Sequence, residues 1–333
     1  MDKLDKRLNS AFSRRSFFAG AGGLAAAAMF AGCGDGGSNA SMTAPSGTYT
    51  DADILNFALN LEYLEAQFYL YAATGKGLAA SDITAGSASP FQTVGTVTLG
   101  NAAAVPGLST AQQQILNEIA YEEQEHVRFL RSALGSAAVP MPSIDLSFFG
   151  PLAVAAGVTG ATFNPFSTFP YFLVGSFIFE DVGVTAYSGA APLISAAGVA
   201  AGYLTAAAGI LAVEAYHAAY IRTSITGAAI AAGSAAAYPY ITVANQVAAL
   251  RASLTVGATA APGTAGSVET PLALPTSLTT ASSIVAASPT TAVGFARTVN
   301  QVLHIVYGSA TVGVAKGGFF PNGMNSIFAT TTA

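Results

Sequence analysis

The sequence predicts an all-α protein built on a four-helix bundle, with a long crossover between the second and third helices and a C-terminal extension. Two observations carry this prediction. Apolar residues recur at spacings of three and four in four separate stretches, which is the pattern of helices with one buried face. A glutamate interrupts each of these four apolar stripes, and a buried carboxylate is costly unless something neutralises it.

The first two helices are delimited by capping residues. Thr50 or Asp51 caps a helix to about Tyr71, and after a connection rich in glycine and proline a second helix runs from Ser109 or Thr110 to near Leu134. Their buried stripes consist of Leu55, Leu59, Glu62, Ala66 and Tyr69 in the first helix, and Leu116, Ile119, Glu123, His126 and Leu130 in the second.

Five prolines mark residues 138–170, where a bundle of this kind needs its crossover, and the aromatic residues there are expected to pack over the bundle end. The third helix is expected at about 171–188 and the fourth at about 196–226. Their stripes consist of Leu173, Ser176, Glu180, Gly183 and Tyr187 in the third helix, and Tyr203, Ala207, Ile210, Glu214, His217 and Ile221 in the fourth. Further helices are expected at 241–254 and 292–307.

Two of the three histidines close the same Glu-x-x-His pattern, Glu123 with His126 and Glu214 with His217. Residues three apart on a helix lie roughly 5–6 Å from each other, so each pair can present one carboxylate and one imidazole to one metal ion. A single copy is more often an exposed hydrogen-bonding pair, but two copies, each with an upstream glutamate on an apolar stripe, favour two metal ions. His304 has no carboxylate three residues before it and is interpreted as an ordinary core or surface histidine.

The candidate ligands are assigned by position. Glu123 and Glu214 are expected to bridge two metal ions, Glu62 and Glu180 to be terminal ligands, and His126 and His217 to complete one metal each. Two divalent cations would neutralise the four carboxylates, and an oxygen-rich set without thiolate favours two Fe ions, with Mn as the alternative.

Some neighbours of these ligands leave alternatives open. Glu65 lies one turn from Glu62 and is the alternative ligand; Glu62 is favoured because a tyrosine follows it after seven residues, as one follows Glu180. Those tyrosines, Tyr69 and Tyr187, either contact the ligands, carry electrons or are ordinary core residues. The acidic residues Glu118, Glu122 and Glu125, together with Arg128, are expected on a solvated face.

Several motifs resemble those of a known family. Residues 60–62 with Tyr69 look like the first helix of ferritin-like proteins, and residues 118–131 resemble the second helix of the branch that includes the plant desiccation-related proteins. The C-terminal motifs 297–308 and 317–323 are similar to bacterial members of that branch. The resemblance implies a di-iron or di-manganese carboxylate protein in a stress setting and does not settle the reaction.

The N-terminus resembles an export signal. Residues 13–18 read SRRSFF, a twin-arginine motif, and an uncharged stretch leads to Cys33, the only cysteine. Residues 30–33 resemble a lipoprotein cleavage box with Phe30 in place of the usual leucine; cleavage near Ala28 or Ala31 without lipidation is the alternative. We therefore expect a signal peptide at 1–33, a flexible tether at 34–49, the bundle at 50–227 and an extension at 228–333, with the protein in the periplasm or cell envelope.

Composition limits the partners. The net charge is −5 and no basic cluster is present, so nucleic acid is not an expected partner. Long uncharged runs at 146–179, 182–213 and 223–250 are rich in alanine and glycine and interrupted by proline, so we discount them as membrane spans. The membrane is expected to be reached only through a lipid on Cys33.

The function expected from the sequence is redox chemistry of a dinuclear centre with oxygen, hydrogen peroxide or ferrous iron. A non-catalytic metal-binding or protective envelope protein is the second reading, and peroxide dismutation of the manganese catalase type is the third.

Overall fold

The computed structural model describes residues 49–158, 163–255, 257, 267–273, 284–288 and 290–332. All of them belong to one unit of the chain, residues 37–333. The predicted signal peptide, with its arginine pair and Cys33, and nearly all of the predicted tether lie outside the described residues.

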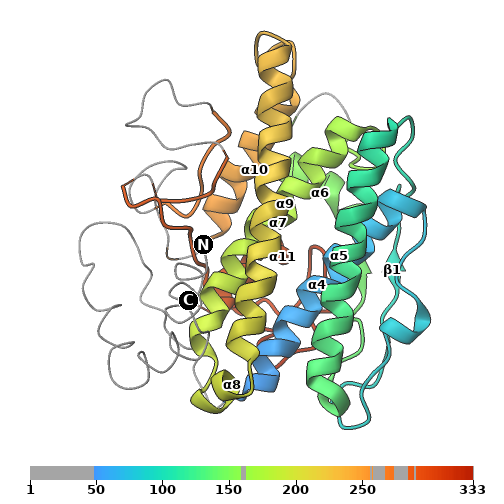
Figure 1. Cartoon of the computed structure of the whole chain (residues 1–333), viewed down its shortest axis with the longest axis vertical. Coiled ribbons are helices and arrows are strands. Elements are labelled where there is room, and N and C mark those ends of the chain that lie inside the picture. The colour runs from blue at the N-terminus through green and yellow to red at the C-terminus, as the bar shows by residue number, and fades with distance from the viewer. Residues whose placement is uncertain are drawn as a thin grey trace, which may run out of the picture. The chain divides into compact units, whose positions relative to one another are not determined.

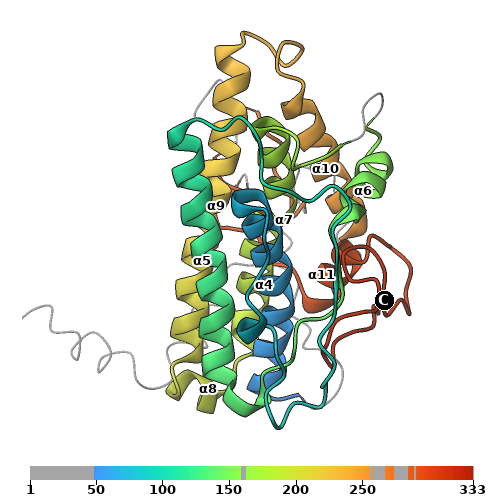
Figure 2. The ribbon, with the colours of Figure 1, turned by 90° about the vertical axis from the view of Figure 1, so that its right-hand side faces the viewer.

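Four long helices form the bundle: α4 (Asp51–Thr74), α5 (Thr110–Leu134), α7 (Phe169–Ala190) and α9 (Tyr203–Ala231). α4 packs mainly on α5 and α7 packs mainly on α9, and the two pairs meet through α4 and α7. Figures 1 and 2 show the four helices side by side, with α5 and α9 on the side away from α10 and α11. The all-α bundle predicted from the sequence is confirmed.

Local capping explains where the first two helices begin. Thr50 and Ser109 each accept a hydrogen bond from the third helical backbone N–H, and the side chains of Asp53 and Gln112 return the contact in a capping box. α4 continues beyond the expected Tyr71, because Gly75, with φ of 72°, supplies the left-handed residue that ends it.

The fourth bundle helix begins later than expected. The residues expected at its start form a separate short helix, α8 (Ala196–Ala200). Gly202, with φ of 90°, then interrupts the helical backbone before α9 begins. A helix cannot pass through a left-handed residue without losing its hydrogen-bond ladder, so the expected single helix is two. α9 then runs five residues past the expected end at Thr226.

The crossover contains short elements and an aromatic cluster. It comprises η2 (Gly135–Ala137), β2 (Ile144–Asp145), η3 (Leu146–Phe148) and α6 (Phe149–Ala155). β2 pairs in parallel with β1 (Val97–Thr98) in the α4–α5 connection, which also holds η1 (Ala80–Asp82). Phe149 and Phe166 pack edge-on or tilted against Phe68 of α4, so the crossover aromatics help to cover the α4–α7 side of the bundle.

The C-terminal extension packs on α7 through α10 (Tyr240–Leu254) and α11 (Val299–Val306). α11 begins later than expected, because Thr298 is the residue that caps its N-terminus. A short 3-10 helix, η4 (Ala191–Leu193), follows α7. Asn60 of α4 donates to the Asn325 backbone carbonyl and accepts from the Asn325 backbone N–H. The extension therefore seals the α4–α7 side of the bundle.

A buried arginine cluster joins the extension to the bundle. It comprises Asp181, Arg222, Arg251, Glu269 and Arg297. All five side chains are at most 2% exposed, and nitrogen–oxygen distances between ion-paired members run from 2.5 to 2.8 Å. Arg251 also lies over the ring of Phe177 and donates to its carbonyl, so the cluster fastens α10 to α7.

Two bundle helices are long and apolar enough to cross a membrane by length and composition: α7 continued through η4, and α9. In α7, 78% of the most apolar stretch is buried inside the bundle, as expected of a core helix. In α9 that share is only 28%, but its two charged side chains, Glu214 and Arg222, both point inward and are fully buried.

Candidate metal centre

The six residues predicted as ligands lie in the interior between the four helices. α4 carries Glu62, α5 carries Glu123 and His126, α7 carries Glu180, and α9 carries Glu214 and His217. Each carboxylate is at most 1% exposed and each imidazole at most 7% exposed. The three-residue spacing places each glutamate and histidine of a pair on the same inward face of its helix.

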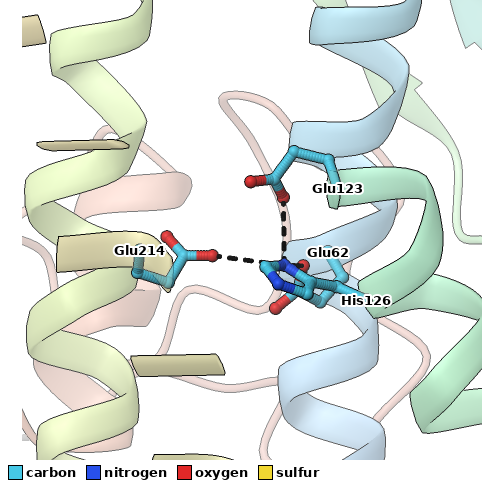
Figure 3. A group of neighbouring side chains, drawn as sticks. All are labelled: Glu62, Glu123, His126 and Glu214. Atoms are coloured by element: carbon cyan, nitrogen blue, oxygen red, sulfur yellow. Dashed lines mark ion pairs between the residues drawn. The ribbon is translucent and has the colours of Figure 1, made fainter. Parts of the chain in front are cut away.

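Three carboxylates surround the His126 imidazole. Its Nδ1 atom lies 3.2 Å from Oε2 of Glu62, 3.6 Å from Oε2 of Glu123 and 3.6 Å from Oε1 of Glu214. These side chains come from α4, α5 and α9 and converge in Figure 3. One donor atom from each of the four residues lies within 4.8 Å of the others, a geometry that can hold a metal ion.

A second group forms around His217. Its Nδ1 atom lies 3.1 Å from Oε1 of Glu123 and 3.5 Å from Oε2 of Glu180. Glu123 belongs to both groups and offers one oxygen to each. A carboxylate in this place would be able to bridge two ions, whereas Glu214 falls in the first group only. The bridging roles of Glu123 and Glu214 both stay predictions.

The donor atoms of both groups lack hydrogen-bond partners. Such buried, unsatisfied atoms are Oε2 of Glu62, both carboxylate oxygens of Glu123 and of Glu214, Oε2 of Glu180, and Nδ1 of His126 and of His217. Buried polar groups are almost always hydrogen-bonded, so a cluster of unsatisfied acceptors that all face one another requires cations or protons. The residues present therefore fit a metal site.

Without metal, protons have to compensate these charges. Burial raises the pKa of Glu214 well above its usual range, and the nearby Glu65 raises it further. Burial alone would lower the pKa of His126, but the nearby carboxylates of Glu62 and Glu123 together outweigh burial and raise the pKa to about 12. Burial alone would raise the pKa of Glu123, yet the two nearby imidazoles of His126 and His217 bring it down to about 2. The metal-free centre thus keeps protons on its imidazoles and on Glu214.

Comparisons with known proteins identify the family of the chain. Residues 50–227 match the ferritin-like domain family. The chain belongs to this family. It is 29% identical over 281 residues, 83% of each chain, to the ferritin-like catalase Nec2 of Nesocodon mauritianus. It is also 34% identical over 179 residues to the desiccation-related protein PCC13-62 of Craterostigma plantagineum, where the match spans only 52% of each chain. No solved structure shows significant similarity to the chain. The resemblance inferred from the sequence motifs is confirmed.

Glu65, the alternative to Glu62, is a fifth buried glutamate in the four helices of this ferritin-like bundle. Glu62 lies in the His126 group, whereas Glu65 belongs to neither group. Glu65 lines a small apolar cavity between α4, α7 and α11, together with Leu61, Leu64, Phe179, Val182, Gly183 and Val306. A side-chain carbon at Gly183 would lie 2.2 Å from Oε2 of Glu214 and 3.3 Å from Oε1 of Glu65, so glycine there makes room for both carboxylates.

Both tyrosines contact candidate ligands, but each contacts the glutamate of the other helix. The hydroxyl of Tyr69 on α4 donates to Oε1 of Glu180 on α7. The hydroxyl of Tyr187 on α7 donates to Oε1 of Glu62 on α4. Each bond leaves the second carboxylate oxygen free to face a metal ion.

Glu122 is a site residue that the sequence reasoning missed. It was expected on the solvated face of its helix, but its Oε2 atom lies 2.7 Å from Nε2 of His217 on α9. The expectation failed because Glu122 is only partly exposed and its partner is 95 residues away in sequence. The other two glutamates of that face agree better with the predicted solvated surface: Glu118 is exposed, and Glu125 pairs with Arg128.

His304 is a core residue outside the centre. Its Nδ1 lies 2.6 Å from the Ser309 carbonyl and its Nε2 lies 3.1 Å from the Thr332 carbonyl. It is fully buried and joins α11 to the C-terminal segment.

Proposed function

We propose that this ferritin-like protein binds two iron or manganese ions between its four helices and uses them to consume hydrogen peroxide. The observation that carries the proposal is the pair of overlapping donor groups joined by Glu123. Such overlap supports two ions close to each other, as two-metal enzymes require.

The donor chemistry supports the choice of metals. The two groups offer carboxylate oxygens and imidazole nitrogens and contain no thiolate, a set that suits iron and manganese. When bound, such ions supply reversible one-electron changes, which allow two molecules of hydrogen peroxide to become one of oxygen and two of water. Peroxide is favoured over oxygen or ferrous iron because the Nesocodon mauritianus relative, which aligns with 83% of the chain, is named a ferritin-like catalase.

The chain's own residues would orient the ligands and keep the centre dry. Tyr69 and Tyr187 hold the terminal carboxylates Glu180 and Glu62 in place. The small apolar cavity that Glu65 lines would hold a small uncharged molecule such as peroxide next to this carboxylate. Glu65, which lies beside Glu214, can take up or release a proton next to the reacting molecule.

The deciding experiment is metal analysis of protein purified from its native compartment, followed by measurement of oxygen release from hydrogen peroxide. About two iron or manganese ions per chain and metal-dependent oxygen release would support the proposal. Oxygen uptake with ferrous iron, without peroxide turnover, would favour an iron oxidase. Bound metal with neither activity would favour the non-catalytic, stress-protective alternative.

We further propose that the protein is exported to the periplasm or cell envelope through its twin-arginine motif and tethered there by a lipid on Cys33. Changing Arg14 and Arg15 to lysine should trap folded precursor in the cytoplasm. Cys33→Ala should release the protein from the membrane fraction. Unchanged fractionation of the Cys33→Ala variant would contradict the lipid anchor and leave export intact.

A further inference from the structure

The two halves of the bundle repeat the spacing of four buried polar residues. The matched pairs are Glu62 with Glu180, Tyr69 with Tyr187, Glu123 with Glu214, and His126 with His217. The repeat breaks at the residue before the Glu-x-x-His motif. That residue is Glu122 on α5 but Val213 on α9.

This break changes the surroundings of one histidine. Oε2 of Glu122 lies 2.7 Å from Nε2 of His217, while Nδ1 of His217 faces Glu123 and Glu180. An ionised carboxylate can only accept a hydrogen bond, so it holds the proton on Nε2 and leaves the Nδ1 lone pair for a metal ion. A carboxylate in this position fixes the tautomer of a ligating imidazole and makes it a stronger donor.

His126 has no such support. Its Nδ1 faces Glu62, Glu123 and Glu214, and no residue in the described part of the chain hydrogen-bonds to its Nε2. The matched position holds Val213, whose side chain has no hydrogen-bonding atom. The imidazole of His126 is therefore less constrained than that of His217.

We propose that Glu122 is a positioning residue that makes the two metal positions unequal. The position built from Glu180 and His217 binds its ion more tightly, and fills first, than the position built from Glu62 and His126. This inference rests on the proposed dinuclear centre and adds an order of filling to it.

Zn²⁺ is a suitable probe because it binds carboxylate and imidazole without redox chemistry. Calorimetric titration of the metal-free full chain should resolve two classes of Zn²⁺ binding. His217→Ala should remove the tighter class and His126→Ala the weaker one. Glu122→Val, which copies the α9 residue, should weaken the tighter class by roughly 10–100-fold, the usual effect of losing such a carboxylate.

Two further variants separate charge, positioning and surface effects. Glu122→Gln keeps an acceptor for Nε2–H without the negative charge, so its loss of affinity should be smaller than that of Glu122→Val. Glu118→Gln removes an exposed charge one turn away on the same helix and should leave both classes unchanged. Circular dichroism confirms folding of each variant, and Glu122→Gln carries the test if Glu122→Val does not fold.

Nitrogen-15 NMR of the Zn²⁺-loaded protein measures a property that would not change if Glu122 had a purely structural role. The wild type should show the proton of His217 on Nε2 as a slowly exchanging resonance, and Glu122→Val should lose that protection. Equal affinities in the wild type, or unchanged affinities in Glu122→Val, would overturn the inference while leaving a dinuclear centre intact. Fewer than two bound Zn²⁺ ions in the wild type would instead contradict the proposed function.

Discussion

Two buried charged clusters begin at adjacent residues of α7 and are built in opposite ways. Glu180 faces the candidate metal centre, whereas Asp181 faces the arginine cluster. Oδ2 of Asp181 accepts from Arg222 at 2.7 Å and from Arg251 at 2.8 Å. In the arginine cluster, each charged side chain has an oppositely charged partner supplied by the chain itself.

The metal centre lacks such partners. No arginine or lysine of the described part of the chain forms an ion pair with Glu62, Glu123, Glu180 or Glu214, and most of their oxygens have no hydrogen-bond donor. Both clusters are equally buried, so burial of charge does not by itself indicate a ligand site. The difference is that arginine supplies a permanent opposite charge in one cluster, whereas the other has only imidazoles, whose charge depends on protonation.

The largest loss of stability should come from removing a carboxylate of the arginine cluster. Asp181→Asn leaves Arg222 and Arg251 without their shared carboxylate, and removing one partner of a buried ion pair typically costs about 3–5 kcal/mol. Urea unfolding of the metal-free protein measures this loss. A loss below about 1 kcal/mol would mean that water or another group replaces Asp181, and the contrast between the clusters would fail.

The loss of stability on metal removal should be nearly as large, and it should come only from the candidate metal centre. A ligand that binds the folded state alone stabilises it by about 4 kcal/mol at a thousandfold excess over its dissociation constant. Chelation should therefore lower the melting temperature of the wild type, and His217→Ala should halve the metal content and remove most of this increment. Asp181→Asn should keep the increment. Identical melting curves with and without metal would exclude a site that ties the helices together.

The metal-free centre should also give a distinctive pH dependence. Burial raises the pKa values of Glu65 and Glu214, so the folded state keeps protons that the unfolded state releases above its ordinary pKa of about 4.5. The raised pKa of His126, about 12, acts in the same direction above pH 6.5. The metal-free protein should therefore melt at a lower temperature at pH 8 than at pH 6.

The metal-loaded protein should show the reverse trend, because metal binding displaces protons and becomes stronger as pH rises. In the metal-free form, Glu123, with its pKa lowered to about 2, adds stability that is lost only when pH falls below about 4.5. Differential scanning calorimetry of both forms between pH 5 and 8 checks the two slopes. Parallel slopes would contradict the assignment of protons to the empty centre.

A smaller effect is expected from the crossed tyrosines. Tyr69→Phe removes the donor to Glu180, and Tyr187→Phe removes the donor to Glu62. Hydrogen bonds to charged groups contribute about 1.5–3 kcal/mol. Tyr69→Phe should weaken the metal position of His217, and Tyr187→Phe that of His126, as read from Zn²⁺ titration. If Tyr69→Phe instead weakened the metal position of His126, and Tyr187→Phe that of His217, the hydrogen bonds would not connect α4 with α7.

The smallest effect belongs to an ion pair on the surface. Arg128 pairs with Asp82 and Glu125, but its side chain is 42% exposed. Exposed pairs contribute about 0–1 kcal/mol, so Arg128→Ala should scarcely change the unfolding midpoint in urea. A loss of stability as large as that of Asp181→Asn would show that burial does not explain the difference between Arg128 and the buried arginines.

The fold and the ligand positions were accessible from sequence because both rest on local periodicity. Each of the four stripes predicts that its glutamate faces inward, and the structure buries Glu62, Glu123, Glu180 and Glu214. One buried face is found in α5 and α9, whereas α4 and α7 are buried on nearly all sides. The start of the fourth helix was not accessible, since residues 196–202 have the alanine-rich composition of a helix and only the backbone of Gly202 breaks it.

The remaining features depend on tertiary contacts that have no local pattern. Arg251 and Arg297 meet Glu269 from segments without clear periodicity, so nothing in the sequence pairs them. Glu122 sits among other acidic residues, and only the approach of α9 distinguishes it from Glu118. Composition and spacing identify which residues are buried together, but they do not identify contacts across helices.

The crossing of the two tyrosines has a consequence for the order of folding. Each helical hairpin, α4 with α5 and α7 with α9, is held by contacts that are local in sequence, so the hairpins should form early. Neither hairpin can complete its own half of the centre, because Tyr69 and Tyr187 each serve a glutamate of the other. A fully formed pair of metal positions therefore exists only after the hairpins have docked. If the proposed metal ions bind, they would therefore bind both positions only after the two hairpins have docked.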